Sequence, residues 1–201
     1  MSSWNELLDR AEPEEHVVQL YGRDDQLLTR NVARFLGKGL RRGDGLVVIA
    51  TPEHADAVLR HLQAESPDAA VALQDGRLVL LDAQGTLDRF MVDGVPDEER
   101  FRQVIGAVLA EVAARAPSGK IRAFGEMVGI LWVDGQESAA IRLEQCWNDI
   151  LAGSSASLFC GYPIDIFDTA AGIPALDAVL RAHTHMNAGP HTMLSSPRAP
   201  R

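Results

Sequence analysis

Residues 121–163, IRAFGEMVGILWVDGQESAAIRLEQCWNDILAGSSASLFCGYP, decide the fold of this chain. The stretch begins with an apolar segment typical of a strand, continues with an amphipathic helix, and ends with a second apolar strand. Acidic and aromatic side chains stand at the ends of the apolar runs, and open α/β sheets bind their ligands at the carboxyl ends of the strands. The stretch therefore predicts a strand–helix–strand unit with a ligand pocket at one edge of the sheet.

The same alternation of strand-like and helix-like segments runs through most of the chain, as in a mainly parallel sheet with helices on both faces. We expect strands at 16–21, 45–51, 77–83, 120–128 and 157–163. Helices are expected at about 24–40, 52–64, 101–112, 135–152 and, from a weaker pattern, 174–184. These elements predict one three-layer α/β/α domain at 14–185, with a lead-in at 1–13 and a disordered Pro/Ser/Arg-rich tail at 186–201.

Composition narrows the classes of partner. The chain has 201 residues, a formal net charge of -9 and a pI of about 5.1, which disfavours a nucleic-acid groove built from clustered Lys and Arg. It has no basic-then-apolar signal pattern, and no apolar run approaches the roughly 20 residues that span a bilayer. We therefore expect a cytoplasmic protein that binds neither nucleic acid nor membrane directly.

The turn after the first expected strand, Leu20-Tyr21-Gly22-Arg23-Asp24-Asp25-Gln26, is where a nucleotide hydrolase would carry its phosphate-binding loop. Such a loop needs several glycines, a lysine and a Ser or Thr. This turn has one glycine, no lysine and two acids, although Arg23 remains able to meet an anion. Asp82, at a strand end, resembles a metal-holding acid of such enzymes only superficially. The sequence argues against ATP hydrolysis.

Two residues at carboxyl ends of strands are the main pocket candidates. Tyr21 ends the first strand, and Glu126 follows Phe124-Gly125 near the end of the fourth. Tyr21 either lines the crevice or is a rim residue whose hydroxyl binds backbone. His16 lies an odd number of residues from Tyr21, so the two occupy opposite faces of the strand, and His16 suits a hydrogen-bonded structural role.

Glu144 is predicted to face the core, because Ala140, Trp147 and Leu151 share its helix face. A buried Glu needs a partner or a raised pKa. Glu144 therefore either binds a structural donor, which we favour, or provides a polar spot in an apolar pocket.

Trp132 and Trp147 are able to stack on a ligand, but tryptophan more often fills a core, and we favour the core for Trp147. Cys160 lies in an apolar strand, where a raised pKa makes a thiol inert. His183, His185 and His191 resemble a metal cluster by composition alone. We assign no metal and no cofactor.

The connection at 83–96 suits either a lid over an apolar ligand or a short helix docked on the sheet. The chain shows no nucleophile-elbow pattern, metal-ligand helix or His-paired cysteine typical of an enzyme. The sequence therefore favours binding over catalysis.

Four ordered motifs carry a resemblance to a known family: HVVQLY at 16–21, RFMVDGVPDEERF at 89–101, the stretch from FGEMVG to CWNDIL at 124–151, and SLFCGYP at 157–163. From about residue 14 to 185 the chain resembles the MEDS domain, the sensory domain named for methanogens, methylotrophs and the DcmR regulator. The resemblance implies a RecA/KaiC-like fold without a working phosphate loop and the sensing of small molecules such as hydrocarbon derivatives. It also implies these characteristic positions: His16, Tyr21, Glu126, Trp132, Glu144, Trp147, Cys160 and Tyr162.

We therefore expect a sensor, not an enzyme. It would bind a small organic ligand, a hydrocarbon derivative or an organic acid, and pass occupancy to a signalling partner of the kinase, anti-sigma or transcription-regulator type, with a homodimer as a further option. One alternative is a degenerate RecA-like nucleotide-binding protein. Another is a protein-interaction scaffold whose crevice is filled by its own side chains.

Overall fold

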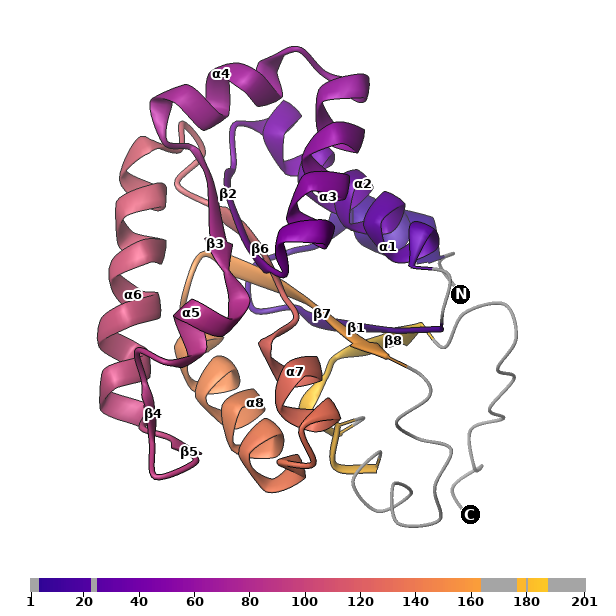
Figure 1. Ribbon diagram of the computed structural model, residues 1–201. Coiled ribbons are helices and arrows are strands. Elements are labelled where there is room, and N and C mark those ends of the chain that lie inside the picture. The colour runs from indigo at the N-terminus through magenta and orange to yellow at the C-terminus, as the bar shows by residue number, and fades with distance from the viewer. Residues whose placement is uncertain (1–3, 23–24, 164–176, 180, 188–201) are drawn as a thin grey trace, which may run out of the picture.

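The computed structural model describes residues 4–22, 25–163, 177–179 and 181–187. A six-stranded sheet forms the central layer, and helices cover both of its faces (Figure 1). Its strands are β1 (His16–Tyr21), β2 (Gly45–Ala50), β3 (Leu78–Asp82), β6 (Ile121–Gly125), β7 (Ala156–Pro163) and β8 (His185–Asn187). They are arranged in the order β3-β2-β6-β7-β1-β8, and each neighbouring pair is parallel. The predicted three-layer α/β/α fold with a parallel central sheet is confirmed.

The helices divide between the two faces of the sheet in chain order (Figure 1). On one face lie α1 (Trp4–Arg10), α2 (Gln26–Arg42), α3 (Pro52–Glu65) and α4 (Asp68–Asp75). On the other lie α5 (Ala83–Leu87), α6 (Glu98–Arg115), α7 (Met127–Val133) and α8 (Glu137–Leu151). None of the helices in the described part of the chain is long and apolar enough to cross a membrane.

Strand alternation builds a separate core on each face. On β1, Val18 and Leu20 face the core beneath α6 and α8, while Val17 faces the core beneath α2 and α3. Residues that are paired in register on neighbouring parallel strands share a face, as Val18 and Cys160 do in one core and Val17 and Phe159 in the other. These two cores fix the directions in which the polar side chains of each strand point.

Arg122 is an exception within the α2 core, because it is a fully buried cation on β6. Its guanidinium pairs with Asp44 at 3.2 Å and donates to the carbonyl oxygens of Leu8 at 2.9 Å and Phe35 at 3.0 Å. A buried charge is tolerated only when it is paired and hydrogen-bonded in this way. Arg122 thus joins α1, α2 and the sheet.

The structure differs from the sequence prediction at several elements. Helices α1 and α4 and strand β8 were not predicted, and the fourth strand ends at Gly125 because residues 127–133 form α7. An apolar run such as this one cannot be assigned to a strand or a buried helix by periodicity alone. Strand β8 includes Met186 and Asn187, the first two residues of the predicted tail, and residues 188–201 lie outside the described residues.

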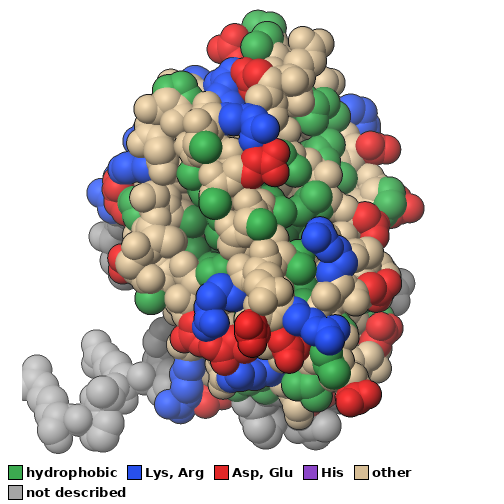
Figure 2. Space-filling model, turned by 90° about the vertical axis from the view of Figure 1, so that its left-hand side faces the viewer, with side chains coloured by type: hydrophobic (Ala, Val, Ile, Leu, Met, Phe, Trp, Pro, Cys, Tyr) green, Lys and Arg blue, Asp and Glu red, His purple; other side chains and the backbone are tan. Residues whose placement is uncertain are grey.

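The connection at 83–96 forms α5 and a small hairpin of β4 (Met91–Val92) and β5 (Val95–Pro96). Phe90 between them is fully buried and meets Phe101 of α6 edge to face, with ring centroids 5.2 Å apart. Of the two options for this connection, the structure thus has the short docked helix. Figure 2 shows the side that carries α6, where acidic and basic side chains are intermixed with hydrophobic ones.

Candidate functional site

The order of the strands opens a crevice at the carboxyl ends of β2 and β6. After β2 the chain runs over one face, through α3 and α4, to β3 at the edge of the sheet. After β6 it runs over the opposite face, through α7 and α8, to β7 in the other direction. Neighbouring strands whose connections leave in opposite directions form the switch point at which open α/β sheets hold their ligands.

A pocket of about 230 Å³ lies at this switch point. Four of the residues that line it stand at or just after the carboxyl ends of four strands: Tyr21 of β1, Thr51 after β2, Glu126 after β6 and Pro163 of β7. The remaining wall comes from His54 on α3 and from Gly129, Ile130, Val133 and Asp134 on and after α7. Its exposed surface is mostly apolar, so it suits a small organic molecule.

Glu126 is the anchor of the pocket. Its carboxylate is 3% exposed and accepts hydrogen bonds from the Thr51 backbone N–H and, at 2.5 Å, from His54 Nδ1. Thr51 is the N-cap of α3, with Pro52 following as the first helical residue. Glu126 therefore occupies the place next to the first turn of α3 where the helix dipole favours an anion.

His54 lies between two carboxylates. Its Nδ1 meets Glu126, and its Nε2 lies 2.9 Å from Oδ2 of Asp25, the N-cap residue of α2. The hydrogen bond to Glu126 is the largest cause that raises the pKa of His54, which reaches about 9. The imidazole is thus a cation at neutral pH, with both N–H groups engaged, and it has no free nitrogen with which to take a proton from a ligand.

Tyr21 completes the polar side of the pocket. Its ring meets His54 edge to face, with centroids 5.8 Å apart. Burial is the largest cause that raises the pKa of Tyr21, and the charge of Glu126 adds to it. The phenol therefore stays neutral and presents a hydroxyl that both donates and accepts hydrogen bonds.

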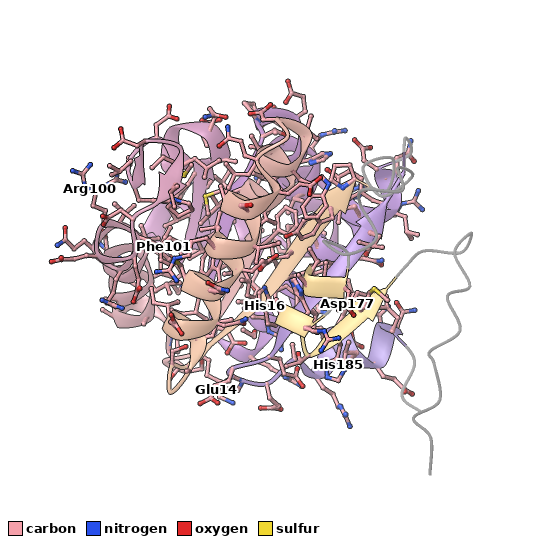
Figure 3. The ribbon with its side chains drawn as sticks, turned by 90° about the horizontal axis from the view of Figure 1, so that it is seen from below. Glu14, His16, Arg100, Phe101, Asp177 and His185 are labelled. Carbon is pink, nitrogen blue, oxygen red and sulfur yellow. The ribbon has the colours of Figure 1, made fainter. Side chains whose placement is uncertain are left out.

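A second polar group lies inside the core on the other face of the sheet. It brings together His16 of β1, Glu144 of α8, and Cys160 and Tyr162 of β7. The segment before β8 adds His183, whose ring centroid is 4.0 Å from that of His16. In Figure 3 the segment that carries Asp177 and His185 lies beside His16. This group, which we call the buried cluster, is sealed from solvent.

A family model matches residues 15–184 of the chain, which is most of its length. The chain belongs to the MEDS family. The family is described as the MEthanogen/methylotroph, DcmR Sensory domain, and this description supports a sensory role. No curated protein sequence matches the chain.

The characteristic positions of the MEDS domain separate into the pocket, the buried cluster and the core. Tyr21 and Glu126 line the pocket. Trp132 is buried and meets Tyr162 edge to face at 5.9 Å, whereas Trp147 packs in the same way on Phe101 at 5.2 Å. Contact with a ligand stays a prediction for all of these positions.

Sequence reasoning about this MEDS domain missed His54, which faces Glu126 from a different element. The available signal was the helix start Thr51-Pro52 directly after a strand, which places the next side chains at the crevice. His183 was grouped with His185 and His191, yet His185 is exposed and lies 3.8 Å from Glu15, and His191 is outside the described residues.

Three further charged residues near strand or helix ends of this MEDS domain are Asp82, Arg23 and Asp134. Asp82 caps the start of α5 by accepting a hydrogen bond from the Gly85 N–H at 2.7 Å, which is a structural role. Arg23 lies outside the described residues. Asp134, which was not singled out from the sequence, lines the pocket after α7.

Proposed function

We propose that this MEDS domain senses a small, mostly apolar organic molecule that binds at the switch-point pocket, and that it passes occupancy to a signalling protein of the kinase, anti-sigma or transcription-regulator type. The observation that carries the proposal is the set Tyr21, His54 and Glu126 at the polar end of an otherwise apolar pocket. An apolar pocket with a few polar groups that converge at one end is typical of a small-molecule binding site.

The charges around the pocket narrow the class of ligand. Glu126 already fills the anion position at the start of α3, and Asp25 and Asp134 add further negative charge. His54 is the only cation that faces them among the described residues that line the pocket. A neutral alcohol, a halogenated hydrocarbon or an amine therefore fits better than an organic acid, and better than the phosphates of a nucleotide.

Binding fits the site better than catalysis. A general base needs an unoccupied basic atom within reach of the substrate proton, and both nitrogens of His54 are held by carboxylates. A RecA/KaiC-like ancestry without a working phosphate loop forms part of the same proposal.

Helix α7 is the element best placed to transmit occupancy. Ile130 and Asp134 line the ligand pocket and also a second pocket of about 200 Å³ on the side of α5 and β4. A seven-residue helix with space on two sides has room to shift. A ligand that contacts only one of its two positions would favour that position by its differential affinity. The partner, or a second copy of the chain, would then read the exposed face of α7, where Val133 is 66% exposed.

A thermal-shift screen tests the proposed ligand class, because a compound that binds only the folded chain raises its melting temperature. The set comprises short alcohols, amines, halogenated hydrocarbons, carboxylic acids and nucleotides. We expect neutral or amine compounds to raise the melting temperature and acids and nucleotides to leave it unchanged. A nucleotide hit would favour the degenerate RecA-like alternative, and a flat screen would favour the scaffold.

Two variants then locate the hit. Tyr21→Phe removes only the hydroxyl and should weaken binding about tenfold, which corresponds to one lost hydrogen bond. His54→Gln should weaken ligand binding further. His61→Gln makes the same change seven residues further along α3 and should leave binding intact. If Tyr21→Phe and His54→Gln bind the ligand as tightly as the wild type and the His61→Gln control do, the ligand binds elsewhere.

A further inference from the structure

The buried cluster contains the atoms of a metal site. His16, Glu144, Cys160 and His183 each offer one ligand atom, and these four atoms all lie within 4.8 Å of one another. His16 Nε2 is 3.2 Å from Cys160 Sγ and 3.3 Å from Glu144 Oε2, and His183 Nε2 is 3.4 Å from Glu144 Oε1. Ligands at about 2.0–2.3 Å from a tetrahedral ion stand roughly 3.3–3.6 Å apart, so the spacings of His16 Nε2 from Cys160 Sγ and from Glu144 Oε2 suit one shared cation.

The second contacts of the two imidazoles leave both Nε2 atoms as acceptors. The Asn148 amide donates to the Ala182 carbonyl at 3.0 Å, which directs its oxygen to His16 Nδ1 at 2.8 Å. His183 Nδ1 lies 2.6 Å from the Val179 carbonyl oxygen. Both Nδ1 atoms therefore carry the proton, and each Nε2 turns a lone pair toward Glu144. Metal-binding histidines are oriented by this kind of contact.

The cluster holds more acceptors than donors. Glu144 Oε2 and His183 Nε2 are buried without a hydrogen-bond partner, and the two side chains are 1% and 0% exposed. The Tyr162 hydroxyl donates to Glu144 Oε1 at 2.5 Å, so Oε2 is the oxygen that remains to bind. Unpaired buried acceptors are rare in native proteins and point to an ion or group that is not shown.

We propose that His16, Glu144, Cys160 and His183 bind one divalent transition-metal ion of the zinc type. Two imidazoles, a thiolate and a carboxylate suit zinc and do not suit magnesium or calcium, which prefer oxygen ligands alone. The thiolate and carboxylate balance the charge of a dication, so the sealed cluster becomes neutral. Binding releases the Cys160 thiol proton, and any proton on Glu144, to solvent.

The site would be structural, because the protein supplies all four ligands and burial leaves no open position. It would fasten the segment before β8 to β1, β7 and α8, and so complete the edge of the sheet. The inference is independent of the organic ligand, since the pocket residues lie at the other polar site.

The first test uses the full chain, stripped of metal with a chelator and then titrated with Zn²⁺ alone or Mg²⁺ alone. We expect about one zinc per chain, a rise in melting temperature with Zn²⁺, and no rise with Mg²⁺. Cobalt(II) in place of zinc should give a thiolate-to-metal charge-transfer band, which reports the cysteine ligand directly. A wild-type chain that binds neither Zn²⁺ nor Co²⁺ would overturn the proposal.

Matched variants assign the ligands. Cys160→Ser should abolish the cobalt band while Cys146→Ser, at the other buried cysteine, keeps it. His183→Ala should lose zinc while His185→Ala keeps it. Asn148→Ala retains all four ligands and should weaken zinc binding by about 10–100-fold through loss of the imidazole contact. Zinc affinity unchanged in these three site variants would overturn the proposal, and the wild-type cobalt band decides the matter if a variant does not fold.

Discussion

The two polar sites of this domain use the same residue types and reach opposite protonation states. At the pocket, His54 has a carboxylate on each ring nitrogen and a pKa raised to about 9. In the buried cluster, desolvation is the largest cause that lowers the pKa of His16 and of His183 to about 4, and burial also raises the pKa of Glu144. The pocket therefore holds an ion pair, whereas the two imidazoles of the buried cluster are neutral in the absence of metal.

The difference between these pKa values follows from how far each imidazole is exposed to solvent and from how many acceptors it contacts. His54 contacts two carboxylates, and its hydrogen bond to Glu126 outweighs the burial that lowers its pKa. His16 and His183 are sealed, and each donates one Nδ1–H to a neutral oxygen. A histidine that lies beside a glutamate therefore does not always form a salt bridge with it. The surroundings of the pair decide whether the imidazole is protonated.

Replacement of Glu126 and of Glu144 by glutamine should lower the free energy of unfolding by unequal amounts. The loss at Glu126 is the largest effect that we expect. Glu126→Gln leaves the His54 cation without its main counter-ion and should lower the free energy of unfolding by about 2–3 kcal/mol. Glu144→Gln in the metal-free chain keeps an acceptor for Tyr162 and adds an amide donor beside two lone pairs. It should change the free energy of unfolding by less than about 1 kcal/mol.

Urea denaturation of the two variants measures this difference, and Glu53→Gln on the exposed first turn of α3 is the control, with an expected change within about 0.5 kcal/mol. Equal losses at Glu126 and Glu144 would mean that both sites hold ion pairs, and the contrast between them would be wrong.

The pH dependence of stability sharpens the comparison. His54 has a folded pKa of about 9, above its unfolded value of roughly 6.5. Its charge therefore stabilises the fold in full below pH ~6.5, and this contribution is lost as the pH rises through about 9. The stability difference between wild type and His54→Gln should be about 1–3 kcal/mol at pH 6 and shrink toward pH 10.

Thermal unfolding at several pH values measures that difference, with His61→Gln as the reference variant. A difference that stays constant from pH 6 to pH 10 would show that His54 is held as a neutral ring, in contrast to the paired cation that its two carboxylate contacts indicate.

The sequence predicted the sheet well and the sites only in part. The first strand coincides with β1, because a continuous apolar run between turn residues has few alternatives. Strand β8 has no such pattern, and it forms because Val17 and its neighbours on β1 leave an open edge to pair with. The strand-end rule needs only local sequence, and it pointed to Tyr21 and Glu126, which line the pocket. It could not predict the contact between His16 and His183, because that contact depends on β8 pairing with β1 at the edge of the sheet.

The two tyrosines offer the finest test, because the chain has only these two and each belongs to one site. Tyr162 donates a buried hydrogen bond to Glu144, so Tyr162→Phe leaves an acceptor unpaired and should lower the free energy of unfolding by about 1–2 kcal/mol. Tyr21 is half-buried at the pocket, so Tyr21→Phe should change stability by less than about 0.5 kcal/mol. Denaturation curves of both variants decide between them. A larger loss at Tyr21 would mean that the pocket is closed and serves the fold, which would count against a ligand site there.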